Sequence, residues 1–263
     1  MGEKDSSKTR VKPVFDALFL KDKTGLSWLG KLLKLPSMLN MELPLFPETL
    51  PLNVHAWGDN EKALFPPRSL LRWLIMNLEI PENYKIENRS ENTQKKREAL
   101  IRKDPAVIRE ALSLLEHPVL LDRAWYILEV PTYPDVYLET EILVVVIEGK
   151  RTEYTSTTKT TWMPVRHQIL RHLDCAWEIR GSRKLFGFFI VEGEGGADAV
   201  NVPERWMKIC SDTISRGALA QSLPHRTLDE QAEIAKCFLG ALTWQKICAE
   251  FQIDWSILPS KIG

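Results

Sequence analysis

The sequence predicts an α/β protein with a mixed central β-sheet flanked by helices. Two continuous apolar runs, ILVVVI at 142–147 and KLFGFFIV at 184–191, are typical of strands that are buried on both faces. Helical spacing of apolar residues precedes, separates and follows these runs, so helices can cover both faces of the sheet. A length of 263 residues, of which 44% are hydrophobic, is sufficient for a sizeable core.

The N-terminal part of the chain is predicted to lie outside the core of the fold. Residues 1–12 are polar and predict a mobile tail. Residues 13–100 alternate apolar patches with prolines, which predicts helical and extended segments packed on the core.

The core itself is predicted to span residues 101–195. Pro105 suits the first turn of an amphipathic helix. Three strands follow at 124–131, 135–140 and 142–147. Because the connections between them are very short, we expect these strands to form an antiparallel meander.

A second core helix is predicted at 165–181, and the apolar strand at 184–191 follows it. The element order within the core is therefore helix, three strands, helix, strand. Residues 196–263 are predicted to be a helical extension, in which a helix over 227–242 starts with a Thr-x-x-Glu capping box.

Composition excludes several classes of function. Lys plus Arg equals Asp plus Glu at 35 each, so no global field attracts a polyanion. The four cysteines lack metal-binding spacing and predict reduced thiols. No signal peptide or bilayer-spanning segment is recognisable, which predicts a cytoplasmic protein without a membrane partner. GxSxG, GxxxxGK[ST] and strand-to-helix GxGxxG motifs are missing from the sequence, and we expect no organic cofactor.

Charged residues mark both ends of the segment 133–153, YPDVYLETEILVVVIEGKRTE. Asp135 starts one strand, and Glu148 and Lys150 end the next. If the turn is centred between the two strands, Asp135 lies across from residues 146–148, and Glu148 and Lys150 point to the same side. A change of one residue in register would reverse this relation. In the favourable register, two carboxylates and one ammonium group converge at one end of the hairpin.

Such a cluster is suited to phosphodiester hydrolysis. Two neighbouring carboxylates repel each other and are best relieved by a divalent cation such as Mg²⁺ or Mn²⁺, which prefers oxygen ligands. The cation polarises a phosphoryl oxygen and lowers the pKa of a bound water. Lys150 would orient this water or neutralise charge that develops on the phosphorus. The residues therefore predict metal-assisted hydrolysis of a phosphodiester.

Pro134-Asp135, an apolar strand and then Glu148-Gly149-Lys150 resemble the signature of the PD-(D/E)XK nuclease superfamily. The predicted element order is similar to the restriction-endonuclease-like αβββαβ core of that family, and the resemblance covers about a third of the chain. It implies that Asp135 and Glu148 bind the metal, that the carbonyl of Gly149 joins them, and that Lys150 serves catalysis. It thus implies a Mg²⁺-dependent nuclease.

The resemblance also implies further site residues on the two helices of the core. Many family members carry a glutamine within a Gln-x-x-x-Tyr pattern on the second helix. Gln168 fits this glutamine and is a catalytic candidate, whereas position 172 is His172 instead of Tyr. Some members use a glutamate of the first helix, and the sequence leaves open whether Glu110 or Glu116 takes this place.

Cationic residues close to these positions predict a basic rim that contacts a nucleic-acid backbone, DNA in preference to RNA. The rim candidates are Arg151, Lys159, Arg166, His167, Arg171 and His172. Because the net charge is zero, a partner protein or a second subunit of a homodimer would strengthen this contact. Two alternatives stay open: a catalytically inactive nuclease fold that binds nucleic acid or protein, and a structural protein whose strand merely ends in charged residues.

Overall fold

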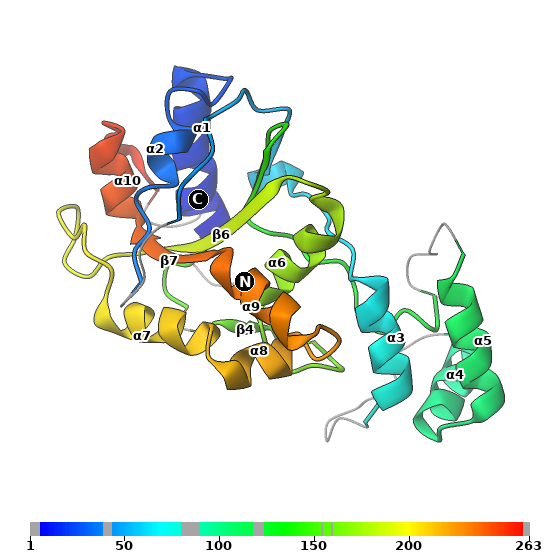
Figure 1. Cartoon of the computed structure of the whole chain (residues 1–263). Helices are drawn as coiled ribbons and strands as arrows, with labels where there is room; N and C mark the ends of the chain where they lie inside the picture. The colour runs from blue at the N-terminus through cyan, green and yellow to red at the C-terminus, as the bar shows by residue number, and fades with distance from the viewer. Residues whose placement is uncertain are drawn as a thin grey trace.

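The computed structural model describes residues 6–38, 44–79, 90–117, 124–153, 155–158 and 160–259. The described chain forms a three-layer α/β body with a helical lobe beside it (Figure 1). The predicted α/β class, with a mixed sheet flanked by helices, is confirmed.

The central sheet has five strands within the described residues. Their order is β1 (Val54–Trp57), β2 (Val136–Glu139), β3 (Leu143–Gly149), β6 (Lys184–Val191) and β7 (Phe238–Thr243). β1, β2 and β3 are antiparallel neighbours, whereas β3, β6 and β7 are parallel. Two short strands, β4 (Thr157–Thr158) and β5 (Arg166–His167), form a separate antiparallel pair. The strands predicted at 135–140, 142–147 and 184–191 are therefore confirmed.

The strand predicted at 124–131 is wrong. The side chains of Tyr126 to Leu128 are buried among apolar residues of the helical lobe. Arg97 of that lobe donates hydrogen bonds to the carbonyl oxygens of Trp125 and Ile127. These two carbonyl groups are therefore bonded to a side chain and not to a neighbouring strand. The first strand of the meander is instead β1, from a stretch that the sequence predicted only as part of the N-terminal segment.

β7 was not predicted, because the sequence placed residues 227–242 in one helix. The capping box of Thr227 and Glu230 is confirmed at the start of α9 (Leu228–Lys236), but the helix ends there and β7 follows. Gly240 in β7 has a φ of +91°, and a Cβ atom at this position would lie 2.3 Å from the backbone oxygen of Ser37. Ser37 forms a β-bridge with Ala241, the residue after Gly240. The two backbone segments therefore pass each other too closely for a side chain at position 240.

Gly240→Ala is expected to lower the free energy of unfolding by about 2 kcal/mol or more, since left-handed backbone and overpacking each cost about 1 kcal/mol or more. Urea denaturation followed by circular dichroism measures the change. Gly217→Ala is the matched control, because Gly217 lies inside a helix and a Cβ atom there meets nothing within 4 Å. We expect this control to be neutral or stabilising, and equal stabilities of the two variants would contradict the prediction.

One face of the sheet is covered by N-terminal and C-terminal elements. These elements are η1 (Ser7–Val11), α1 (Lys12–Lys21), α2 (Leu29–Leu32) and α10 (Trp244–Glu250). Two short 3-10 helices, η2 (Gly58–Asn60) and η3 (Trp255–Ile257), are also present. Val11 and Phe15 are fully buried in one core with Val145 and Ile147 of β3. The predicted mobile tail is therefore wrong for its described part, whereas residues 1–5 lie outside the described residues.

The opposite face is covered by α6 (Gln168–Ile179), α7 (Glu204–Thr213), α8 (Arg216–Ser222) and α9. Ile169 and Leu173 of α6 pack in a second core with Val144 and Val146 of β3. The helix predicted at 165–181 is thus confirmed. Gly181, whose φ is +59°, follows directly after its C-cap residue.

The lobe consists of α3 (Arg68–Asn77), α4 (Glu91–Ile101) and α5 (Pro105–Leu115), which lie together at one side of the molecule (Figure 1). Its own apolar core includes Leu70, Leu74, Leu100 and Leu115. The helix predicted to begin at Pro105 is confirmed as α5, but it packs in the lobe. The place of the first core helix, on the sheet, is taken by α1.

The body contains α1, β1, β2, β3, α6 and β6 in this order, with α2 between α1 and β1 and the short strands β4 and β5 between β3 and α6. The lobe is inserted between β1 and β2. Leu64, before the lobe, and Thr132, after it, exchange two backbone hydrogen bonds of 2.8 Å each. The chain therefore leaves the body and returns to it at one paired position, close to the start of β2.

Candidate active site

The β2–β3 hairpin brings Asp135 and Glu148 to the same end of the sheet. Its register pairs Val136 with Ile147, and one residue further on this register sets Asp135 across from Glu148. Oδ2 of Asp135 accepts a hydrogen bond of 2.8 Å from the backbone N–H of Gly149. The hairpin thus has the register on which the predicted site depends.

Lys150 connects the end of β3 with the start of α6. Its Nζ lies 2.9 Å from Oε1 of Glu148 and donates a hydrogen bond of 2.8 Å to Oε1 of Gln168. Gln168 is the first residue of α6. The structure therefore brings together the four predicted catalytic residues, Asp135, Glu148, Lys150 and Gln168.

The backbone at Gly149 is held by elements from both ends of the chain. A Cβ atom at Gly149 would lie 2.8 Å from Cγ2 of Val11 and 2.9 Å from Cζ2 of Trp244, so only glycine fits. The indole N–H of Trp244 also donates to the carbonyl oxygen of Lys150 at 3.2 Å. Both contacts come from outside the core that the sequence predicted, and no local pattern in the sequence indicates them.

Glu148 is an ionised carboxylate in a nearly closed environment, with 4% of the residue exposed. Burial opposes its ionisation, but the Lys150 ammonium and the hydrogen bond from His172 outweigh burial and lower the pKa of Glu148. Burial also opposes the charge on Lys150, yet the neighbouring Glu148 and Asp135 carboxylates raise the pKa of Lys150. The two groups therefore stabilise each other in their charged forms at neutral pH.

His172 is a site residue whose role the sequence did not predict. Its Nε2 lies 3.0 Å from Oε2 of Glu148, and its Nδ1 lies 2.9 Å from Oγ1 of Thr132. Burial lowers the pKa of His172 although Glu148 acts in the opposite direction, so the ring is neutral at neutral pH. The sequence did contain an indication that His172 lies near the site. His172 follows Gln168 by four residues, and residues four apart share one face of a helix.

Asp135 has an electrostatic environment opposite to that of Glu148. Burial and the nearby charge of Glu148 raise the pKa of Asp135 well above its ordinary value, and Glu61 adds to this effect. The Gly149 N–H and Lys150 act in the other direction but do not outweigh them. Ionisation of Asp135 would therefore place a second carboxylate charge beside Glu148, and a bound cation would relieve this repulsion.

The predicted basic rim is wrong for three of its members. Arg166 and His172 are 0% and 1% exposed, and Arg171 is 7% exposed. Arg166 and Arg171 both pair with Glu129, at 3.0 and 2.6 Å. A charged group almost never enters the interior without such a partner. The sequence favoured Glu129 as the partner of a basic residue, but it did not identify these two arginines. Arg166 and Arg171 thus form buried ion pairs, and none of these three side chains is exposed enough to form a basic rim.

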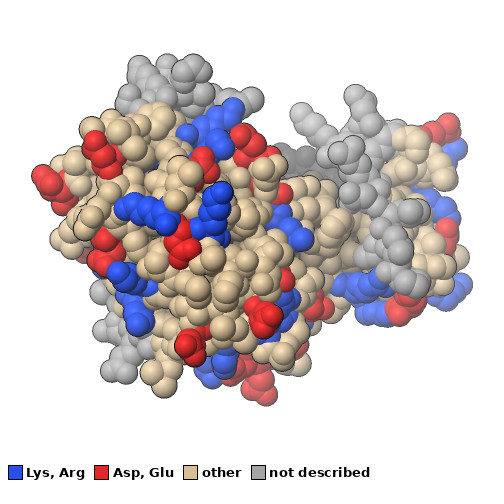
Figure 2. All heavy atoms as spheres, turned by 90° about the horizontal axis from the view of Figure 1, so that it is seen from above, with Lys and Arg blue, Asp and Glu red and all other residues tan. Residues whose placement is uncertain are grey.

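The other rim candidates have mixed outcomes. The Arg151 side chain is 7% exposed and lies 3.7 Å from a carboxylate oxygen of Glu192. His167 is half-buried, and its ring contacts Oγ1 of Thr213 at 3.2 Å. Lys159 lies outside the described residues. On the face drawn in Figure 2, Lys and Arg are interspersed with Asp and Glu, in line with the zero net charge.

Neither Glu110 of α5 nor Glu116, the residue after α5, belongs to the site. Glu116 forms an ion pair with Arg72, and Glu110 forms one with Lys96. Both pairs lie on the lobe and are solvent-exposed or half-exposed. The open choice between the two glutamates is therefore resolved against both, because α5 packs in the lobe and not on the sheet.

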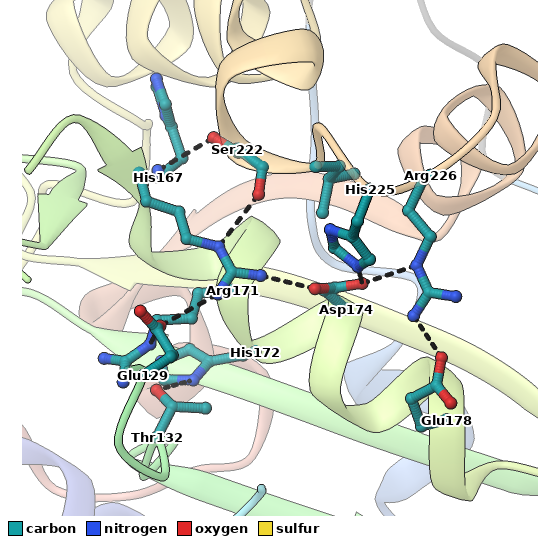
Figure 3. A network of polar contacts seen from close by, with 12 residues as sticks. Glu129, Thr132, His167, Arg171, His172, Asp174, Glu178, Ser222, His225 and Arg226 are labelled. Carbon is teal, nitrogen blue, oxygen red and sulfur yellow. Dashed lines mark hydrogen bonds and ion pairs between the residues drawn. The ribbon is translucent and has the colours of Figure 1, made fainter. Parts of the chain in front are cut away.

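A buried ion network supports α6 behind the site (Figure 3). Asp174, which is 0% exposed, pairs with Arg166 at 2.5 Å and with Arg226 at 2.9 Å. His225 lies 3.2 Å from the same carboxylate. Arg166 also donates to the carbonyl oxygen of Ser222 at 3.0 Å, so the network joins α6 to α8 and to the turn before α9.

Within the described residues, no three side chains of His, Cys, Asp or Glu are grouped so that they could hold a metal ion. A cation at this site would therefore depend on two carboxylates, a backbone carbonyl, water and substrate. None of the described helices is long and apolar enough to cross a membrane. Comparisons of the chain with protein families, with curated proteins and with solved structures found no match.

Proposed function

We propose that the chain is a metal-dependent nuclease that hydrolyses phosphodiester bonds, with DNA as the substrate class. The observation that carries this proposal is the meeting of Asp135, Glu148, Lys150 and Gln168 at one end of the sheet. The order α1, β1, β2, β3, α6, β6 further supports a restriction-endonuclease-like core. Both observations agree with the PD-(D/E)XK resemblance.

The donor set fits Mg²⁺ or Mn²⁺. Mg²⁺ is often bound by only one or two carboxylates, while water and substrate phosphate complete its coordination. Asp135 and Glu148 would hold the cation together with the carbonyl of Gly149, and the raised pKa of Asp135 supports a cation at this place. When bound, the cation supplies Lewis-acid polarisation of the phosphoryl oxygen.

Lys150 acts as a cation in this proposal. Its raised pKa keeps the ammonium protonated at neutral pH, so Lys150 cannot accept a proton from the attacking water. It stabilises negative charge that develops on the phosphate. Gln168 orients the ammonium through Oε1, and its amide nitrogen is a donor for phosphate or water.

Cleavage of supercoiled plasmid and of single-stranded DNA tests the proposal. We expect the wild type to cleave DNA with Mg²⁺ or Mn²⁺ and to be inactive with EDTA. Lys150→Met should be slower by about 100-fold, since one electrostatic contact to the transition state is removed. Lys184→Met is the control, because Lys184 is exposed at the opposite end of the sheet.

Two results would contradict the proposal. Wild-type protein that cleaves neither DNA nor RNA with any divalent cation would favour a binding protein that keeps the nuclease fold. Lys150→Met that cleaves as fast as Lys184→Met would show that the active site lies elsewhere. Circular dichroism of each variant establishes that it is folded.

A further inference from the structure

A hydrogen-bonded relay runs from the segment before β2 through α6 to Glu148. It consists of Thr132, His172 and Glu148, which are 3%, 1% and 4% exposed. We propose that Thr132 and His172 are positioning residues, which fix the Glu148 carboxylate for binding the cation. This inference rests on the proposed function.

The direction of each hydrogen bond in the relay follows from its acceptor. An ionised carboxylate can only accept, so Nε2 of His172 carries the proton that is shared with Glu148 at 3.0 Å. Nδ1 is then the acceptor, and the Thr132 hydroxyl donates to it at 2.9 Å. Figure 3 shows the contact between Thr132 and His172. The hydroxyl therefore fixes both the tautomer and the orientation of the ring.

The relay holds the oxygen of Glu148 that Lys150 does not hold. Oε2 accepts from His172, and Oε1 lies 2.9 Å from Nζ of Lys150. A carboxylate held at both oxygens has little freedom to rotate. Because each oxygen has two lone-pair sites, both remain able to bind a cation.

The same part of α6 also holds the segment that leads to Asp135. Arg171, next to His172, donates to the carbonyl oxygen of Val130 at 2.7 Å. The backbone of Thr132 is bonded to Leu64 in both directions, and Asp135 follows three residues later. α6 therefore sets the positions of both carboxylates, one through His172 and the other through the segment 130–132.

Thr132→Val tests the relay with little risk to the fold, because valine has nearly the same shape and the backbone bonds to Leu64 do not depend on the side chain. Thr132→Ser retains the hydroxyl and serves as the conservative variant. We expect Thr132→Val to lower kcat by about 10-fold or more and to weaken Mn²⁺ binding, measured by calorimetry, by a similar factor. KM for DNA should stay unchanged, and Thr132→Ser should restore kcat and metal affinity.

A purely structural threonine would give a different result. Thr140→Val removes a buried hydroxyl at the opposite end of the same hairpin, and we expect it to change thermal stability without changing metal affinity. If the wild type cleaves DNA and Thr132→Val matches Thr132→Ser in both kcat and Mn²⁺ affinity, the positioning role is wrong while the nuclease function stands. A wild type that neither binds Mn²⁺ nor cleaves nucleic acid overturns the proposed function and this inference with it.

Discussion

Asp135→Asn is expected to abolish cleavage, with a loss of about 1,000-fold or more, and to raise the free energy of unfolding at neutral pH. The loss of activity follows from removal of one of the two carboxylates that would hold the cation. The gain in stability follows because ionised Asp135 is disfavoured by burial and by the charge of Glu148. Asparagine keeps an acceptor oxygen for the Gly149 N–H, so the local hydrogen bond can persist.

The pH dependence of the stability gain follows from the raised pKa of Asp135. Below the ordinary pKa of aspartate the group is protonated in both the folded and the unfolded state, and the variant has no advantage. As pH rises through the folded-state pKa, the wild type loses stability, so the difference between variant and wild type grows and then levels off. Urea unfolding in EDTA between pH 4 and 9, roughly the range in which carboxyl groups titrate in proteins, measures this difference.

Mg²⁺ should reverse the order of stability of the wild type and Asp135→Asn. A ligand that binds only the folded state stabilises it, so added Mg²⁺ should raise the unfolding free energy of the wild type and leave Asp135→Asn unchanged. Glu141→Gln is the control, because Glu141 is exposed at the other end of the hairpin. An Asp135→Asn variant that is both active and less stable than the wild type in EDTA would refute this account of the site.

Asp174→Ala is expected to lower the free energy of unfolding by about 3–5 kcal/mol at neutral pH. The substitution removes the carboxylate that Arg166, His225 and Arg226 share in the interior. Loss of one partner from a buried ion pair leaves a charge without compensation, which is strongly destabilising. Thermal and urea unfolding followed by circular dichroism measure this effect.

Asp212→Ala provides a matched control for Asp174→Ala. Asp212 also lies on a helix and pairs with Lys208, but both side chains are exposed, at 59% and 75%. Exposed pairs contribute between 0 and about 1 kcal/mol, so this variant should remain close to the wild type. Similar losses in the two variants would show that the buried network does not stabilise α6.

Stability that depends on Asp174 should also be sensitive to acid. Burial opposes ionisation of this carboxyl, but the hydrogen bond from His225 and the charges of Arg166 and Arg226 lower its pKa. A depressed folded-state pKa contributes stability above the ordinary aspartate value, and this stability is lost as pH falls through the folded-state pKa. The difference in unfolding free energy between the wild type and Asp174→Ala should therefore become smaller in acid.

The parts of the site that the sequence predicted are local in the chain. Asp135 and Glu148 belong to one hairpin, whose short turn fixes the register between its two strands. Gln168 starts the next helix, and the distance from Lys150 is bridged by their two long side chains. Short-range geometry was sufficient for these residues.

The parts that the sequence did not predict depend on distant partners. An arginine on an apolar helix looks the same in a sequence whether it faces solvent or a buried carboxylate. Arg166 is buried because Glu129 and Asp174 are placed beside it by the fold. In the same way, α1 rather than α5 covers the sheet, and only three-dimensional packing decides which of the two helices lies there.

The paired position of Leu64 and Thr132 has a consequence for how this protein can change over evolution. The two hydrogen bonds between these residues keep the roots of the lobe side by side, whatever the chain between them does. The entropy lost on closing such a loop grows only with the logarithm of its length, so residues can be added to or removed from the lobe at low thermodynamic cost. Thr132 is also the first member of the relay to Glu148. A change in the length of the lobe would therefore leave the residues of the proposed active site in place, although the lobe begins and ends next to them.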